Sequence, residues 1–372
     1  MGSPPHRSGG HTHRQVVRAW LLAAGVVGLC GVTLFGAAAA RVILACVFSA
    51  VATDALMGLL SRSPFQGRSE RAALTGMLLA LTLPATTPWA VALFGSVVAV
   101  LVGQGIFQGR LMPALVGRVV TQYVFSGYLF LAGTLLYSPV LTPAHLFFGD
   151  ISDAERVVHY QGWFESQEST IHNAYELERP VQILRKFAHA RLPADGDLIF
   201  TPILRDQLPP WRDTVFGVVP GGIGETCIIG LIVAGMYLVH RGFLRWQLPV
   251  TLVASAAFAL SILPVETAAG FRWFPVLEIE QNQAVGLAYI LHHLTAGQIM
   301  LTAFLLAVDP ISSPLRVHGQ IIFAAGIGLI AAFMRLYGSL DGECYWAVLL
   351  MNAFVGMIDR QLRRPVLGIA EE

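Results

Sequence analysis

The chain has 372 residues, of which 55% are hydrophobic and only 13% are charged, and its mean hydropathy is +0.63. Soluble domains carry about 25% charged residues, so this composition excludes an ordinary soluble enzyme and indicates a polytopic membrane protein. The net charge of +1 gives no bulk attraction to polyanions, and we expect no nucleic-acid partner.

The first sixteen residues contain histidines and arginines but no apolar core, so they indicate a short polar tail and not a signal peptide. The cysteines lie in or beside apolar runs and form no CxxC pair: Cys30, Cys46, Cys227 and Cys344. A buried apolar cysteine usually acts as a small hydrophobic residue. We therefore expect no metal or iron–sulfur site held by this chain alone.

About ten apolar runs follow one another along the chain. They lie near Val17–Ala40, Val42–Leu60, Ala72–Leu83, Trp89–Ile106, Leu115–Leu136, Cys227–His240, Leu248–Ile262, Ala284–Val308, Ile321–Met334 and Tyr345–Ile358. A straight membrane span needs roughly 20 residues, and several runs are shorter. The predicted fold is therefore an all-α polytopic bundle of about ten transmembrane helices, some of them short or broken.

Two segments interrupt hydrophobic sequence with proline and glycine. Between Arg71 and Gln104, two apolar runs are separated by Pro84–Pro88, and the glycine-rich turn Phe216–Thr226 precedes another run. Irregular backbone at membrane depth is stable only where protein or a cavity satisfies its polar groups. Such breaks are typical of membrane proteins that handle a cofactor or a solute.

Arginine placement orients the bundle, because arginine gathers in cytoplasmic loops. With the N-terminus inside, the inside loops and the C-terminal tail hold most arginines: Arg62, Arg68, Arg71, Arg110, Arg118, Arg241, Arg245, Arg316, Arg360, Arg363 and Arg364. The short outside loops hold Arg41 and Arg272, and Arg335 lies at a helix end. We therefore expect both termini in the cytoplasm.

The same topology divides the chain into five parts. Residues 1–16 and 361–372 are predicted to be cytoplasmic tails, and residues 17–137 and 221–360 to be two membrane halves of five helices each. Residues 138–220 form one long, acidic segment that faces outside. Its tryptophans, Trp163 and Trp211, favour a small ordered cap over a free linker.

Acidic residues at membrane depth are rare and usually functional. Asp54 lies inside the second run and Glu225 at the start of the sixth, which makes both candidates for an ion path. A role as a helix-end anchor stays open for each of them, because the helix dipole favours a carboxylate near the first turn. Glu266 is expected in an outside loop, and Asp359 in an interfacial ion pair with a neighbouring arginine.

Five segments in order carry a family resemblance: LTGMLLALTLPATTPWAVALFGSVVAVLVGQ, MPALVGRVV, FGVVPGGIGET, AVDPISSP and GECYWAVLLMNAFVGMIDR. Together with the opening His11-Thr12-His13, they make the chain similar to the RnfD component of Rnf electron-transport complexes. A relative of that component is NqrB of the sodium-translocating NADH:quinone reductase. The resemblance runs collinearly from residue 11 to about residue 368.

The resemblance implies a covalent FMN, held through a phosphoester bond by a threonine of the external segment. The family's acceptor pattern, Asp-x-x-Ser/Thr-Gly/Ala-Ala-Thr, matches this chain at Asp195 and Thr201, followed by Pro202. Bulky Leu198-Ile199-Phe200 replaces the small residues, and would crowd the threonine or tuck the segment into the membrane interface. Thr201 is thus either the FMN attachment residue or an ordinary loop threonine.

A second departure lies at Gly103–Leu115, where the family's asparagines are absent. Amide side chains suit the edges of a flavin ring because they both donate and accept hydrogen bonds. Without them we do not expect a second, noncovalent flavin, although Gln104 and Gln108 could substitute.

The resemblance further implies a subunit of a translocase in a bacterial inner membrane. It would carry electrons through flavin and couple them to sodium or proton movement. Its implied partners are the other subunits of an Rnf-type complex, the lipid bilayer and a flavin transferase. Two alternatives stay open: a flavin-free structural scaffold of the same complex, and a solute channel or transporter, since broken helices fit that class too.

Overall fold

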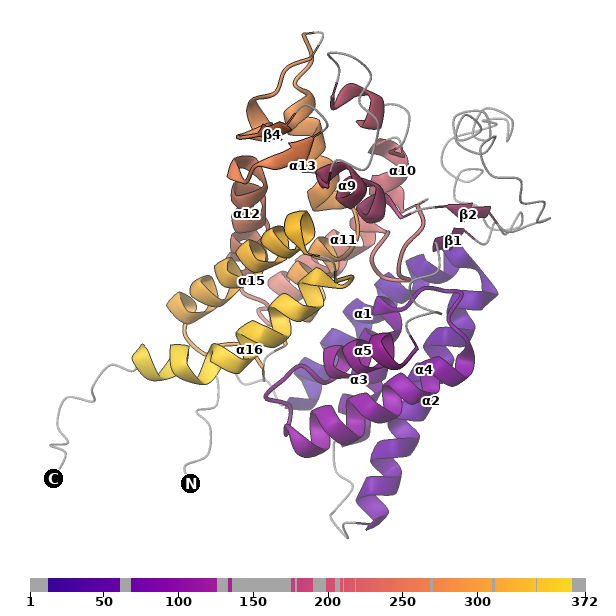
Figure 1. Cartoon of the computed structure of the whole chain (residues 1–372). Coiled ribbons are helices and arrows are strands. Elements are labelled where there is room, and N and C mark those ends of the chain that lie inside the picture. Colours follow the sequence, from indigo (N-terminus) through magenta and orange to yellow (C-terminus); the bar gives the residue numbers. More distant parts are fainter. Residues whose placement is uncertain are drawn as a thin grey trace, which may run out of the picture.

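The computed structural model describes residues 13–60, 68–125, 133–135, 175–177, 179–189, 199–204, 208–209, 211–217, 219–267, 270–280, 282–309, 312–338 and 340–362. Within these ranges the chain is almost entirely helical, which confirms the predicted all-α class (Figure 1). The predicted tails and much of the external segment lie outside the described residues. The division into two five-helix halves stays a prediction.

The first group of helices coincides with the first predicted apolar runs. It consists of α1 (His13–Phe35), α2 (Ala37–Leu60), α3 (Arg68–Thr82), α4 (Trp89–Val98), its π-helical continuation η1 (Ala99–Ile106) and α5 (Pro113–Val124). The α2 helix packs along α3 and α4, and α1 packs on α3 and α11. The α5 helix ends at Val124, whereas the predicted run extends to Leu136; residues 126–132 lie outside the described residues.

The second group of helices follows the glycine-rich turn. It consists of α11 (Ile228–His240), α12 (Gln247–Ile262), α13 (Val285–Thr295), α14 (Gln298–Leu301), η4 (Thr302–Leu306), α15 (Val317–Tyr337) and α16 (Glu343–Gln361). The α15 helix packs between α12 and α16. The predicted run Ala284–Val308 is bent by 53° between α13 and the following helix, as in a broken span or a re-entrant loop.

Several helices are apolar and long enough to cross a bilayer. Among the described residues, four pass on length and composition alone: Arg14–Phe35, Ala37–Leu60, Trp89–Ile106 and Val317–Tyr337. The bent pair Val285–Leu306 would be a fifth, and α11 and α12 are apolar but shorter. The structure thus supports a multi-pass membrane protein, and the count of about ten spans stays a prediction.

Short elements from residues 138–220 gather beside α13 at one end of the bundle (Figure 1). They include α9 (Pro180–Ala188) and α10 (Trp211–Phe216). Beside them lies a hairpin of β3 (Val265–Thr267) and β4 (Gly270–Arg272), followed by the 3₁₀ turn η3 (Pro275–Leu277). A further pair, β1 (Gly133–Leu135) and β2 (Tyr175–Leu177), is antiparallel. A bridge between His189 and Glu266 joins α9 to the hairpin, so the external segment and the α12–α13 loop share one side of the bundle.

At the first predicted helix break, the glycine-rich turn donates hydrogen bonds to the carbonyl groups left free where α3 ends. The α3 helix ends at Thr82, and its last carbonyls accept from the turn: Gly224 N donates to Leu81 O at 2.8 Å, and Ile223 N to Leu83 O at 2.9 Å. A Cβ at Gly224 would lie 2.7 Å from Leu81 Cβ, so only glycine allows this approach. Arg118 of α5, itself buried, donates to Thr82 O at 3.2 Å.

A second buried arginine satisfies the break between α13 and α14. Arg335 donates to His293 O and, at 3.1 Å, to Ala296 O, which are carbonyls freed where the helix ends. Its charge is balanced by Glu343 at 2.5 Å, and Glu343 also meets Arg185 of α9 at 3.1 Å. The sequence placed Arg335 simply at a helix end, whereas it is completely buried and ties three helices together.

Candidate functional site

Thr201 is half-buried and begins a short helical turn after an anchored backbone segment. The side chains of Ile199 and Phe200 are buried, and Phe200 is 0% exposed. Its ring lies edge-on to Phe187 and Tyr289, with centroids 5.1 and 5.2 Å apart. Two of the bulky residues that depart from the family pattern therefore point into the protein core, while Asp195 and Leu198 lie outside the described residues.

The carboxylate of Glu280 is the closest polar partner of Thr201. The Thr201 hydroxyl donates to Glu280 Oε2 at 2.7 Å. Backbone N–H groups of Ile199, Phe200 and Thr201 also donate to this carboxylate, at 2.8, 2.9 and 2.8 Å. Glu280 comes from the loop between η3 and α13, 79 residues further along the chain. One carboxylate thus fixes both the hydroxyl and the backbone that leads to it.

These hydrogen bonds also set the charge state of Glu280. Burial raises the pKa of the carboxyl, but the hydrogen bonds from the Phe200 amide, the Thr201 hydroxyl and the Ile199 and Thr201 amides together outweigh it. The pKa of Glu280 therefore lies below its ordinary value, so the group is a carboxylate at neutral pH. A stabilised carboxylate is a strong hydrogen-bond acceptor and a weak base.

This arrangement is compatible with a phosphoester on Thr201. Successive backbone N–H groups are donors that proteins use to hold phosphoryl oxygens. The buried anchors Ile199 and Phe200 keep the backbone in place, while the Thr201 side chain stays half-buried. In the same place the Glu280 carboxylate now accepts all of these donors, so an added phosphoryl group would compete with it.

Glu225 is buried where the glycine-rich turn meets α16. Its Oε2 accepts from Gly222 N at 3.1 Å, and its Oε1 accepts from the hydroxyl of Tyr345. The guanidinium of Arg118 lies over the Tyr345 ring, 5.6 Å from its centroid. Glu225 is only 3% exposed, so its carboxyl group is enclosed by these polar groups inside the bundle.

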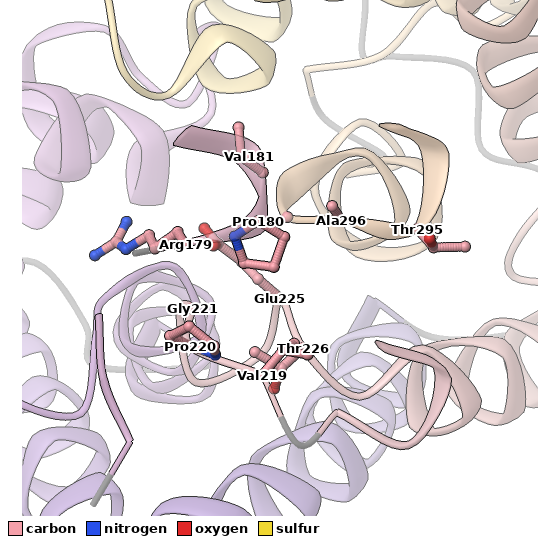
Figure 2. A pocket seen from close by; sticks show the side chains of 11 residues that line it. Arg179, Pro180, Val181, Val219, Pro220, Gly221, Glu225, Thr226, Thr295 and Ala296 are labelled. Carbon is pink, nitrogen blue, oxygen red and sulfur yellow. The ribbon is translucent and has the colours of Figure 1, made fainter. Parts of the chain in front are cut away.

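A small cavity lies beside Glu225 (Figure 2). Its volume of about 20 Å³ is enough for a single water molecule or small ion. The glycine-rich turn, the start of α9 and the end of α13 enclose it, through Arg179, Pro180, Val181, Val219, Pro220, Gly221, Glu225, Thr226, Thr295, Ala296 and Gly297. Among the described residues, none forms a hydrogen bond with the buried Thr226 hydroxyl, so a polar occupant would be satisfied at this point.

Asp54 lies elsewhere. It is buried on the face of α2 that also carries Cys46 and Ser49, and the Ser49 hydroxyl donates to Leu93 O of α4 at 3.1 Å. Asp54 is therefore buried on α2 and does not line the cavity beside Glu225.

The amides considered for a second flavin have other positions. Gln104 donates to the Thr75 hydroxyl at 2.7 Å and so ties η1 to α3. Gln108 is exposed and has a positive φ of 53°, as a turn residue would. Within the part of the chain that the structure describes, no three His, Cys, Asp or Glu side chains gather as metal ligands.

The apolar helices of spanning length, with buried ion pairs between them, define a multi-pass membrane protein. The description "NQR2, RnfD, RnfE family" matches residues 1–368, and the chain belongs to that family.

Curated relatives agree over nearly the whole length, and each is named as the D component of a complex. The chain is 27% identical to that of the Na(+)-translocating ferredoxin:NAD(+) oxidoreductase complex of Acetobacterium woodii, covering 100% of this chain and 96% of that protein. It is 28% identical to that of the ion-translocating oxidoreductase complex of Halorhodospira halophila, covering 98% and 94%. It is 26% identical to that of the proton-translocating ferredoxin:NAD(+) oxidoreductase complex of Clostridium ljungdahlii, covering 97% and 93%.

Sequence reasoning singled out Thr201 and Glu225 but missed their partners. Glu280 lies in a short loop among other polar residues, with no motif to mark it, and Tyr345 lies inside an apolar run. Both contacts join residues far apart in the chain, 79 and 120 positions respectively. No periodicity or spacing in the sequence signals such pairs.

Proposed function

We propose that the chain is the RnfD-type component of an ion-translocating oxidoreductase complex and carries FMN on Thr201. Family membership over residues 1–368 and the names of relatives that align over nearly their full length support the first part. The observation that carries the second part is the Thr201 hydroxyl itself, which is half-buried and directed at a polar acceptor in a segment with a rigid anchor. Bound flavin would supply the capacity to accept and pass on electrons.

Attachment of FMN to a hydroxyl requires a flavin nucleotide with an activated phosphate, which a transferase must supply. The Thr201 oxygen forms a bond to the phosphorus of an activated flavin nucleotide, and the hydroxyl proton is released to solvent. A flavin dinucleotide provides the activation, because its phosphoanhydride bond breaks and a nucleoside monophosphate leaves. This chain contributes the oriented hydroxyl and the backbone donors around it, which reduces the cost of ordering the acceptor.

Attachment is tested by co-expressing the chain with an active flavin transferase and viewing a denaturing gel for flavin fluorescence. The wild-type band should fluoresce, Thr201→Ala should be dark, and Thr201→Ser should retain some fluorescence because it keeps a hydroxyl. A dark wild-type band would favour the scaffold alternative, in which the chain supports the complex without flavin.

We propose Glu225 as the ion-path residue of the bundle, because it is a buried carboxylate beside a small cavity at the junction of two broken helices. Asp54 is the second candidate, buried on α2. If both serve one path, that path must run through the first helical group, since the cavity beside Glu225 does not include Asp54.

We propose a bacterial inner-membrane location with both termini in the cytoplasm. The shared side of α9 and the β3–β4 hairpin supports this, because both belong to loops that arginine placement puts outside. A reporter fused at Ala154 should be active only on the external side, and one fused after Glu372 only on the cytoplasmic side. Opposite results would reverse the orientation and the side on which Thr201 lies.

A further inference from the structure

Glu280 makes four contacts with one short segment, and all of them depend on the same two carboxylate oxygens. Three come from consecutive backbone N–H groups, at residues 199–201, and the fourth from the hydroxyl that is the proposed acceptor. The segment and Glu280 belong to different external loops. Neither loop requires this pairing for its own fold. The Glu280 carboxylate therefore connects the two loops.

Modification of Thr201 removes the basis for one of these contacts. An ester oxygen carries no hydrogen, so the present separation of 2.7 Å between Thr201 Oγ1 and Glu280 Oε2 would become a contact between two acceptors. The phosphodiester also adds a negative charge next to a carboxylate whose depressed pKa keeps it ionised. Both effects drive the Glu280 side chain away from Thr201.

The backbone donors would then need a new acceptor. Buried or half-buried N–H groups rarely remain without one, because each unpaired donor is costly. The phosphodiester oxygens on Thr201 are covalently held beside the donors of Ile199, Phe200 and Thr201, and they carry the charge that the departing carboxylate carried. They are therefore suited to take the place of Glu280.

We propose that Glu280 is a positioning residue whose carboxylate holds the Thr201 segment before modification and is replaced there by the phosphodiester afterwards. This inference rests on the proposed attachment of FMN at Thr201. The exchange releases the loop that carries Glu280 from the external segment at the moment when the cofactor is attached. The attached phosphodiester is then held by the same N–H groups that held the carboxylate.

The replacement of Glu280 is tested by hydrogen–deuterium exchange of the full chain in detergent. Mass spectrometry follows the peptide that contains residues 199–201, in unlabelled and in flavin-labelled protein. In unlabelled protein, Glu280→Ala should speed exchange of these amides about tenfold or more, as expected for the loss of charge-assisted hydrogen bonds. Glu280→Gln should have a smaller effect because it keeps one carbonyl acceptor. Glu278→Ala is the matched control, since it removes a carboxylate two residues away that pairs with Arg272 at 3.9 Å, and it should leave these amides unchanged.

In labelled protein the wild-type amides of residues 199–201 should stay protected from exchange. Glu280→Ala should leave their exchange rate unchanged. If amide protection at residues 199–201 still depends on Glu280 in labelled protein, the phosphodiester does not replace the carboxylate. If it does not depend on Glu280 in unlabelled protein, the carboxylate does not hold the segment. If the wild type takes no label in the presence of active transferase, the proposed function and the replacement fail together. If it is labelled and only the Glu280 dependence is missing, the proposed function stands and this inference alone fails.

Discussion

Glu225 and Glu280 both accept hydrogen bonds from backbone amides and one side-chain hydroxyl. They differ in how deeply they are buried and in which parts of the chain they join. Glu225 accepts from the Gly222 amide and the Tyr345 hydroxyl, and Glu280 accepts from three amides and the Thr201 hydroxyl. Glu225 is 3% exposed and its partners are fixed by the turn and by α16. Glu280 is half-buried, and its contacts join two segments that lie 79 residues apart in the chain.

The difference shows that burial and chain connection, more than the number of hydrogen bonds, decide which carboxylate can move. Displacing Glu225 would leave the Gly222 amide and the Tyr345 hydroxyl without their acceptor inside the bundle, which is costly for buried donors. Displacing Glu280 leaves its donors beside the phosphodiester that the proposed modification attaches to Thr201, and that group can accept from them. We therefore assign a fixed role to Glu225 and an exchangeable one to Glu280.

The largest effect expected concerns the scaffold beneath Glu225. Glu343→Ala removes the carboxylate that balances buried Arg335 and leaves its charge uncompensated, so we expect a loss of about 3–5 kcal/mol. Glu280→Ala in the same thermal-unfolding assay in detergent should lower the midpoint far less, because solvent can satisfy the freed groups. Equal losses would mean that the Glu280 contacts contribute as much to stability as the buried Arg335–Glu343 ion pair.

The next effect concerns the segment that Glu280 holds. The family pattern alone predicts that Ser, Gly and Ala in place of Leu198, Ile199 and Phe200 would raise the flavin-labelled fraction. The structure reverses that expectation, since Phe200 is completely buried and Phe→Ala costs about 3–5 kcal/mol. Phe200→Ala should therefore lower the labelled fraction, measured by gel fluorescence per amount of chain. An increase would show that bulk at Phe200 hinders the transferase.

A smaller effect is expected for the fixed carboxylate. Glu225→Gln keeps a side chain of the same shape and an oxygen for the Gly222 amide, so the complex should assemble. Removing the ionisable carboxyl group should lower ion-coupled electron transfer in proteoliposomes by about tenfold, equivalent to roughly 1.4 kcal/mol. Full coupling in Glu225→Gln would leave a helix anchor as its role, and failure to assemble would indicate a structural requirement.

The smallest effect is a pH dependence at the exchangeable carboxylate. The pKa of Glu280 is depressed in the folded chain, so its contribution to stability is present above the unfolded value of about 4.3 and is lost as pH falls through the lower folded value. Protection of amides 199–201, corrected for the intrinsic rate, should fall in that acidic range in the wild type. Glu280→Gln should show no such transition, and a transition in both proteins would assign it to another group.

The fold class and the first helix break were predictable because they depend on local pattern. Pro84 and Pro88 cannot continue a helix, and the glycines before Glu225 permit the close approach to Leu81. The second break was not predicted, because Ala296 and Gly297 interrupt no hydrophobic run. The carbonyls freed at that break are satisfied by Arg335, a partner distant in sequence.

The candidate sites were predictable only in part, for the same reason. Thr201 matched a motif and Glu225 stood out as an acid beside an apolar run. Glu280 and Tyr345 acquire meaning only from the contacts that the fold creates. The bulk of Phe200 looked like an obstacle in the sequence, because the direction in which a side chain points is not visible there.

The central claim, that Thr201 is the acceptor and Glu280 its replaceable partner, is tested most directly by peptide mass mapping of the chain co-expressed with a flavin transferase. The account predicts that the peptide containing Thr201 gains the mass of FMN less one water, in wild type but not in Thr201→Ala. An unmodified Thr201 peptide in the wild type, or the same mass gain on another residue, would contradict it.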